Sequence, residues 1–143
     1  MIQIRECSNA DFNEIVILLQ QLWPDKSLGV QSLKIVYEKA LFSENQKYIC
    51  AVEESKVIGF GSLTIKNNLW LEGNLGHIDE LVVDNSTRGK GVGSQLLKEL
   101  IQIAKEKNCR RIELDTAFHR KDTHRFYENQ GFENRAYLFS MVL

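Results

Sequence analysis

The chain has 143 residues, of which 43% are hydrophobic and 26% are charged. A chain of this length can bury roughly two-thirds of its unfolded surface in one core, so we expect a single domain over residues 1–143. The 18 basic and 19 acidic residues give a net charge of −1. This balance lacks the basic excess of a general nucleic-acid binder, and a small-molecule partner is expected instead of a nucleic acid.

No apolar run approaches the roughly 18 residues of a membrane-spanning helix, and the chain opens without a signal-peptide core. We therefore expect a cytoplasmic location and no membrane partner. Cys7, Cys50 and Cys109 are odd in number and far apart, and they lack CxxC spacing. They are expected to be reduced core cysteines, with no metal site.

The first third of the chain predicts a strand and two helices. Alternating residues at 2–7 indicate a strand. Ser8 followed by Asp11 is a capping-box variant that begins a first helix, which Trp23 ends, and a second helix is expected over residues 28–41. The apolar positions that recur at helical spacing are Phe12, Ile15, Val16, Leu19 and Leu22 in the first helix, and Leu33, Val36, Tyr37, Ala40 and Leu41 in the second.

Strand periodicity then returns at residues 48–52, 57–65 and 76–83, which predicts an antiparallel meander of three strands. A long helix is expected from residue 92 to about residue 107. The alternation at 111–115 predicts a fifth strand, parallel to the fourth because a helical crossover separates the two.

A glycine-spaced basic loop joins the central strand to the long helix. Gly89, Gly91 and Gly93 fall at the expected start of that helix, where the first N–H groups have no partner and favour an anion. Arg88 and Lys90 add positive charge, so a phosphate or pyrophosphate is the expected ligand. The alternative is a surface loop that only turns the chain. Neither the Walker pattern nor the dinucleotide-binding pattern fits the spacing.

A second motif lies near the end of the chain. Residues 123–132 read THRFYENQGF, which predicts a short helix that Gly131 ends. By itself this is compatible with a small core helix that has Tyr127 at its edge. Together, the RxxGxG pattern of residues 88–93 and the FYxxxGF pattern of residues 126–132 resemble the signatures of the GNAT superfamily of N-acetyltransferases. The resemblance spans nearly the whole chain.

The resemblance implies an α/β (α+β) fold with a mixed, mainly antiparallel sheet that is splayed between strands four and five and flanked by about four helices. Acetyl-CoA, the cosubstrate, would lie in the gap. The implied cofactor-binding residues are Leu81, Val82, Val83, Arg88, Gly89, Lys90, Gly91, Val92, Gly93, Ser94 and Tyr127. Tyr127 would lie beside the thioester sulfur, where a phenol can give a proton to the departing thiolate.

The central strand supplies three candidates for the base that deprotonates the amine. Strict alternation places His77 and Asp79 on one face and Glu80 on the other. A β-bulge would change which acid reaches the site. We expect Asp79 as the base, with Glu80 second and His77 third, although each could equally be an exposed or salt-bridged strand residue.

Two loops are expected to border the acceptor site, with Trp23 and Asp25 on one and Trp70 and Glu72 on the other. His77 on the central strand is a further candidate for binding the acceptor. Aromatic and acidic groups suit a cationic amine, although aromatic residues in loops also anchor packing. The expected acceptor is a primary amine of a small molecule such as an amino sugar or polyamine. Residues 76–83 are similar to the corresponding strand of glucosamine-6-phosphate N-acetyltransferases. The alternatives are a protein N-terminal or lysine acetyltransferase and a non-catalytic CoA-binding regulatory module.

The chain ends in a strongly apolar segment, which is expected to be a closing strand over residues 136–142. Such a strand has more apolar surface than an exposed sheet edge tolerates. The family resemblance and this edge together predict a homodimer.

Overall fold

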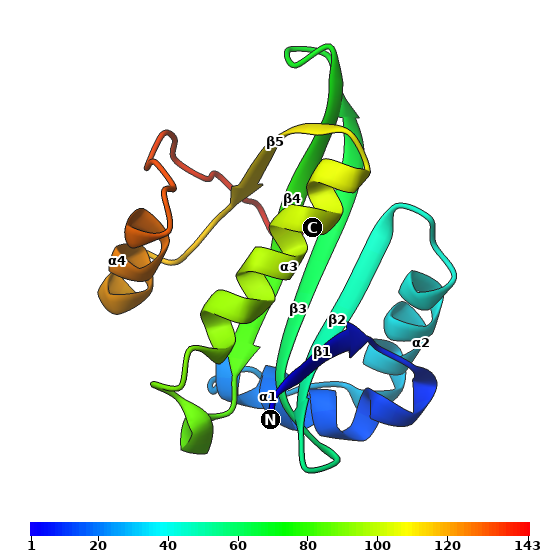
Figure 1. Ribbon diagram of the computed structural model, residues 1–143. Helices are drawn as coiled ribbons and strands as arrows, with labels where there is room; N and C mark the ends of the chain where they lie inside the picture. Colours follow the sequence, from blue (N-terminus) through cyan, green and yellow to red (C-terminus); the bar gives the residue numbers. More distant parts are fainter. The chain divides into compact units, whose positions relative to one another are not determined.

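A computed structural model describes residues 1–143, which divide into two compact units, Met1–Glu113 and Leu114–Leu143 (Figure 1). Each unit is described by itself. The strands are β1 (Gln3–Glu6), β2 (Gln46–Glu53), β3 (Lys56–Asn68), β4 (Gly73–Val83) and β5 (Cys109–Leu114). The α-helices are α1 (Phe12–Leu22), α2 (Val30–Leu41), α3 (Val92–Glu106) and α4 (Lys121–Asn129), and the short 3₁₀ helices are η1 (Asn9–Asp11) and η2 (Asn85–Thr87).

The five strands form one sheet in the order β1-β2-β3-β4-β5. Strands β1 to β4 pair antiparallel in sequence order, whereas β5 lies parallel to β4 because α3 separates the two strands along the chain. The predicted meander and the predicted mixed α/β fold are therefore confirmed.

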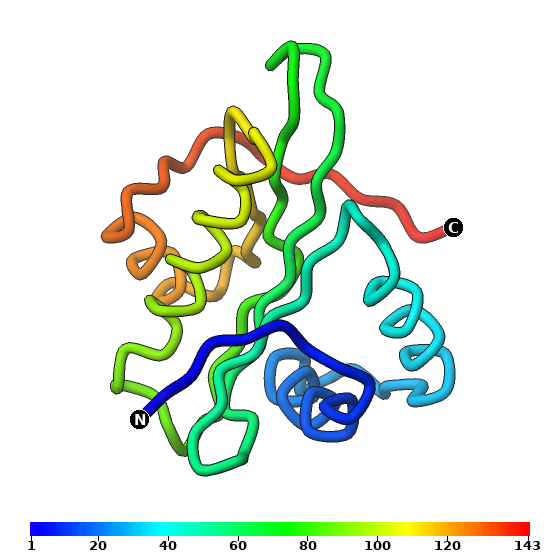
Figure 2. Tube along the Cα trace, turned by 45° about the vertical axis from the view of Figure 1, so that its right-hand side comes forward, coloured from blue at the N-terminus to red at the C-terminus, as the bar shows by residue number.

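Helix α3 covers one face of this sheet, and helices α1 and α2 cover the other (Figure 2). Two glycines on β3 allow α3 to approach closely. A Cβ on Gly59 would lie 2.8 Å from Leu96 Cδ1, and one on Gly61 would lie 3.1 Å from Leu100 Cδ1. Leu96 and Leu100 are both fully buried. Side chains at these two strand positions would push the helix away from the sheet.

The opposite face is packed by a row of aromatic rings that runs from α1 through α2 to the sheet. Phe12 and Tyr37 have ring centroids 5.3 Å apart, Tyr37 and Tyr48 are 5.5 Å apart, and Tyr48 meets Phe60 edge-on at 5.3 Å. These spacings are typical of favourable aromatic pairs. The row fixes α1 and α2 against the side of the sheet to which Tyr48 and Phe60 belong.

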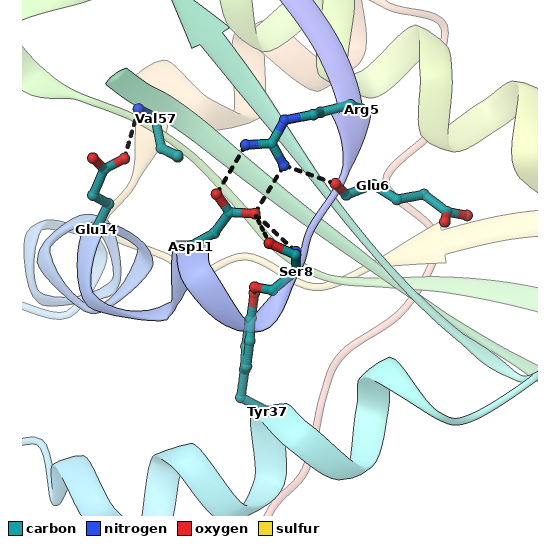
Figure 3. A network of polar contacts seen from close by, with 7 residues as sticks. All are labelled: Arg5, Glu6, Ser8, Asp11, Glu14, Tyr37 and Val57. Atoms are coloured by element: carbon teal, nitrogen blue, oxygen red, sulfur yellow. Dashed lines mark hydrogen bonds and ion pairs between the residues drawn. The ribbon is translucent and has the colours of Figure 1, made fainter. Parts of the chain in front are cut away.

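Polar contacts fix the entry into α1 (Figure 3). The Ser8 N–H donates to Asp11 Oδ2 at 2.8 Å, which is the carboxylate half of the predicted capping box. The Asp11 carboxylate also accepts two hydrogen bonds from Arg5, at 2.8 and 2.9 Å. The Tyr37 hydroxyl donates to the Ser8 carbonyl at 2.7 Å, which connects α2 to the same turn. The hydrogen bonds from Arg5 hold the pKa of Asp11 below its ordinary value.

Three sequence predictions need correction. Residues 136–142 do not form a closing strand, and their apolar side chains, including Phe139 at 91% exposure, find no cover. Val36 belongs to the apolar stripe of the second helix, which is expected to face the core, but it is 56% exposed because α2 turns that side to solvent. Of the predicted core cysteines, only Cys50 is fully buried, while Cys7 and Cys109 are partly exposed; all three are free thiols.

The second unit contains α4 and the extended C-terminal residues. Tyr127 on α4 contacts the rings of Phe126 and Phe132, with centroids 5.2 and 5.6 Å away. Gly131 has a φ of +98°, and its N–H bonds the Glu128 carbonyl, so it ends the helix as the sequence predicts. None of the helices in either unit has the length and apolar character required to cross a membrane.

Candidate functional site

The glycine loop forms the connection from β4 to α3. Gly89 and Gly91 have φ values of +85° and +79°, and Gly91 is the N-cap residue of α3. A Cβ on either glycine would meet no atom within 4 Å. Glycine is therefore required at these positions by the backbone conformation and not by close packing. The arrangement leaves open space beside the first N–H groups of a 15-residue helix.

The side chains of this loop divide into charged groups in solvent and apolar groups in the core. Arg88 and Lys90 are exposed, whereas Val92 is 1% exposed and anchors the first turn of α3. Gly93 and Ser94 are partly buried in that turn. The remaining predicted cofactor-binding residues lie at the end of β4, where Val82 is buried and Leu81 and Val83 are partly buried.

Asp84 holds the entry to the loop. Its carboxylate accepts a hydrogen bond from Gln21 Nε2 at 3.3 Å and lies 3.6 Å from Lys56 Nζ. The Gln21 side chain in turn accepts the Asn85 N–H at 2.9 Å. Gln21 belongs to α1, so the helix on one face of the sheet is bonded to the strand end from which the glycine loop begins.

A β-bulge in β4 decides how the candidate bases are arranged. Ser62 on β3 pairs with Glu80, and Leu63 pairs with Ile78, so the strand register skips Asp79. The next pair is Thr64 with His77. Ser62 and Thr64 are two positions apart on β3, so they lie on one face of the sheet. Their partners Glu80 and His77 lie on that same face, although they are three positions apart along β4. The β-bulge, which is the alternative to strict alternation, is therefore present, and His77 and Glu80 do not lie on opposite faces.

Hydrogen bonds bring Asp79 into the same group. Its Oδ1 lies 2.9 Å from His77 Nδ1, and its Oδ2 accepts a hydrogen bond from the Thr64 hydroxyl. The side chains of His77 and Asp79 are 29% and 34% exposed. Both carboxylate oxygens of Asp79 therefore already have protein partners.

Glu80 has a different environment. Its Oε1 accepts a hydrogen bond of 2.6 Å from the Ser62 hydroxyl, which is the only hydrogen bond that the carboxylate receives. Burial raises the pKa of Glu80 above its ordinary value, and the nearby negative charge of Asp79 adds to this effect. The hydrogen bond from Ser62 and the charge on His77 act in the other direction and lower the pKa. The carboxylate is thus a stronger base than an exposed glutamate, and Oε2 is left to take a proton.

Tyr48 is a member of this group that the sequence analysis missed. It pairs with Ser62 across β2 and β3, so it lies on the same face as Glu80. Burial and the charges of Glu80 and Asp79 raise the pKa of Tyr48 to about 12, so the phenol stays protonated at neutral pH. In the sequence, Tyr48 is recognisable only as the start of a strand. Its position beside Glu80 follows from the pairing of β2, β3 and β4, in which Tyr48 pairs with Ser62 and Ser62 pairs with Glu80.

Of the residues expected at the acceptor site, His77 lies beside Asp79, whereas Trp70 lies far along the hairpin from the carboxylates. Trp23 packs against the core cluster below α1, and Asp25 is exposed in the following loop. Trp70 lies at the far turn of the β3–β4 hairpin, 76% exposed, with the Arg111 guanidinium 5.9 Å from its ring centre. The ladder continues four residues beyond Thr64 before that turn, which is about 13 Å of strand.

Tyr127, the predicted acid, lies on α4 in the second unit. Burial raises its pKa to about 12, an effect that the positive charge of Arg120 partly offsets. Its phenol therefore keeps its proton at neutral pH and can serve as a proton donor.

Comparison with known proteins identifies the family. The family model for the acetyltransferase (GNAT) family matches residues 10–132. The chain belongs to the GNAT family. It is accordingly an acetyl-CoA-dependent N-acetyltransferase.

Individual relatives cover nearly the whole of this GNAT domain. The aminoalkylphosphonate N-acetyltransferase of Salmonella typhimurium is 29% identical over 141 residues, which cover 99% of this chain and 91% of the relative. Glucosamine 6-phosphate N-acetyltransferase 1 of Dictyostelium discoideum is 30% identical over 128 residues, covering 87% and 80%. A crystal structure from Bacillus halodurans C-125, described as a transcriptional regulator, superposes with a TM-score of 0.88 at 27% identity and covers 100% of both chains.

Proposed function

We propose that this N-acetyltransferase transfers the acetyl group of acetyl-CoA directly to a primary amine of a small molecule, with Glu80 as the base. The observation that carries the proposal is the environment of Glu80, whose carboxylate is partly buried, has a raised pKa and receives its one hydrogen bond at Oε1, which leaves Oε2 for the proton. An amine in water is an ammonium ion and cannot attack an acyl carbon until it loses a proton. This choice places Glu80 ahead of Asp79, whose two oxygens are engaged by His77 and Thr64.

The glycine loop fits the pyrophosphate of acetyl-CoA. The left-handed glycines at 89 and 91 leave open space in front of the first N–H groups of α3, and Arg88 and Lys90 supply positive charge beside them. In this proposal residues 88–94 hold the pyrophosphate, and the strand residues Leu81, Val82 and Val83 hold the pantetheine arm. Acetyl-CoA supplies the activated acetyl group as a thioester.

The side chains then have separate roles. Glu80 Oε2 takes the proton of the ammonium, directly or through a water molecule, and Tyr127 on α4 gives a proton to the sulfur as it leaves. Asp79 and His77 form a hydrogen-bonded pair whose negative carboxylate favours a cationic acceptor on this face of the sheet.

A small molecule is favoured as acceptor because the relatives named above act, by their descriptions, on an aminoalkylphosphonate and on glucosamine 6-phosphate. A protein N-terminus or lysine is the alternative acceptor. The non-catalytic regulatory module is not retained as a candidate, because the family match identifies an N-acetyltransferase.

The deciding experiment measures CoA release from acetyl-CoA over a panel of aminoalkylphosphonates, amino sugars with and without a 6-phosphate, polyamines and peptides. We expect turnover with a small primary amine. Turnover with peptides alone would favour the protein acetyltransferase. CoA binding without turnover on any of these amines would contradict the proposed acceptor class.

The role of Tyr127 is tested by Tyr127→Phe, which keeps the ring that packs against Phe126 and Phe132. We expect kcat to fall by about 10²–10⁴-fold, the usual contribution of a positioned general acid. The thermal shift caused by CoA should persist, since only a transition-state interaction is lost. A kcat within threefold of the parent protein would refute the assignment.

We also propose that the protein is a homodimer in the cytoplasm. Support for the dimer comes from the exposed apolar side chains near the C-terminus, which are Tyr137, Leu138, Phe139, Met141, Val142 and Leu143. A surface of this kind is normally covered by a partner. Light scattering at high concentration tests the dimer, and a particle of 16.5 kDa would remove it.

A further inference from the structure

The Ser62 hydroxyl is bonded twice to one residue across the bulge. It donates to Glu80 Oε1 at 2.6 Å and accepts the Glu80 backbone N–H at 2.9 Å. Ser62 is 0% exposed and is one of the few buried polar residues of the chain. A hydroxyl that is removed from water must find partners inside the protein, and this one finds both in Glu80.

These two bonds constrain Glu80 in different ways. The bond to the N–H fixes the backbone of Glu80 at the bulge, where the register slips past Asp79. The bond to Oε1 fixes the direction of the carboxylate and directs Oε2 away from Ser62. Since a single oxygen atom makes both contacts, the backbone and the carboxylate cannot move independently of each other.

The same hydroxyl also lowers the pKa of Glu80, against the net upward shift. Burial and the neighbouring Asp79 both favour the neutral acid, while His77 and the Ser62 hydrogen bond favour the carboxylate. Tyr48 faces the pair from β2 and stays neutral. Ser62 is therefore an uncharged group of this cluster whose hydrogen bond favours the ionised form of a partly buried glutamate.

We propose that Ser62 is a positioning residue of the acetyltransferase, which holds Glu80 oriented and ionised so that it can take the proton of the acceptor amine. The proposal rests on the proposed role of Glu80. Ser62 itself touches neither the amine nor acetyl-CoA.

Thr64 provides a matched control. It lies two residues along β3 on the same face, and its hydroxyl donates to the other carboxylate, that of Asp79. Thr64→Val removes the Thr64 hydroxyl with little change of volume, and Ser62→Ala removes the Ser62 hydroxyl in the same way. The two variants therefore compare the loss of a hydroxyl at Glu80 with the same loss at Asp79.

The first measurement follows the Glu80 carboxyl carbon by ¹³C NMR through a pH titration of the protein without acceptor. In Ser62→Ala we expect the pKa of Glu80 to rise above that of the parent protein, because a donor to the charged form is lost. In Thr64→Val it should not rise. An unchanged pKa in Ser62→Ala overturns the proposal, whatever the acceptor is.

The second measurement is the pH profile of kcat/KM with an amine found in the acceptor screen. The acidic limb in Ser62→Ala should move to higher pH, and kcat/KM at its acidic end should fall about tenfold, which corresponds to one hydrogen bond to a charged group. The limb in Thr64→Val should stay in place. A uniform loss at all pH values in Ser62→Ala would show a structural role only and would overturn the proposal.

Glu80→Gln separates this proposal from the function on which it rests. If Glu80→Gln is inactive and the limb in Ser62→Ala does not move, the base assignment stands and the Ser62 proposal fails. If Glu80→Gln keeps its activity, both fail. Should Ser62→Ala not fold, Ser62→Cys carries the test, since a thiol is a weak donor of similar size, while Ser62→Thr keeps the hydroxyl and should restore the limb.

Discussion

The glycine loop and the β4 bulge have different proposed roles, since the loop is proposed to bind the cofactor and the bulge to position the base. The two regions also differ in how they are built. The loop exposes backbone, since Gly89 and Gly91 have positive φ values and a side chain there would touch nothing. The bulge is built from side chains that bond one another, with Ser62 on Glu80 and Thr64 on Asp79. One region is open, and the other is densely hydrogen-bonded.

This difference shows what each region must recognise. A pyrophosphate is bound by N–H groups and positive charge, which any backbone at a helix start can supply once bulky side chains are absent. Proton removal needs a carboxylate with a shifted pKa, and such a shift requires neighbouring groups in fixed positions. Substitutions in the loop should therefore affect cofactor binding, whereas those at the bulge should affect the rate.

The largest effect is expected at the bulge. Glu80→Gln keeps the size of the side chain and removes the base, so kcat/KM should fall by about 10²–10⁴-fold. Asp79→Asn should cost less, because the oxygens of Asp79 are bonded to His77 and Thr64. Steady-state kinetics on both variants checks this. The reverse order of losses would restore Asp79 as the base.

The CoA-induced thermal shift should remain in Glu80→Gln, since the bulge does not contribute to the loop. Its disappearance would contradict the division between the two regions.

A smaller effect, on binding alone, is expected in the loop. CoA at a hundredfold excess over Kd should stabilise the protein by about 2.7 kcal/mol, because it binds only the folded state. Gly91→Val should abolish this stabilisation, since its side chain would fill the open space and force a β-branched residue to a φ of +79°. Thermal melts with and without millimolar CoA measure it.

Gly29→Ala serves as the control for this test. Gly29 also precedes a helix, but its φ of −83° is ordinary and a Cβ there would be 3.8 Å from its nearest neighbour. The apo form of Gly91→Val should stay folded. A full CoA shift in Gly91→Val would show that the cofactor lies elsewhere.

The smallest effect is expected from the exposed charges of the loop. Lys90→Ala should weaken CoA binding by only a few fold, since an exposed charge contributes about 0.2–1 kcal/mol. The difference between Lys90→Ala and the parent protein should shrink as salt is raised from 0.05 to about 1 M, where screening is nearly complete. Isothermal titration at both salt concentrations measures this, and a loss that is independent of salt would contradict the electrostatic account.

Local sequence determined the secondary structure and the glycine loop of this protein. Period-two and period-3.6 patterns predicted the meander and the helices, and the spacing of glycines at 89, 91 and 93 predicted the loop that the structure shows at the start of α3. These features depend on residues that are near one another in the chain. These features arise from the fixed periods of strands and helices and from the freedom of glycine in φ. Both causes can be recognised within a short stretch of sequence.

Only the tertiary structure decided the arrangement of the carboxylates and the fate of the C-terminus. Ser62 and Tyr48 join Glu80 because β2, β3 and β4 pair in one register with a bulge, and a one-residue slip moves a side chain to the other face. The apolar residues after 135 have a strand-like composition, but a strand exists only where a partner accepts its hydrogen bonds, and they pair with none. Strand pairing depends on two segments together, so it cannot be predicted from the sequence of either segment alone.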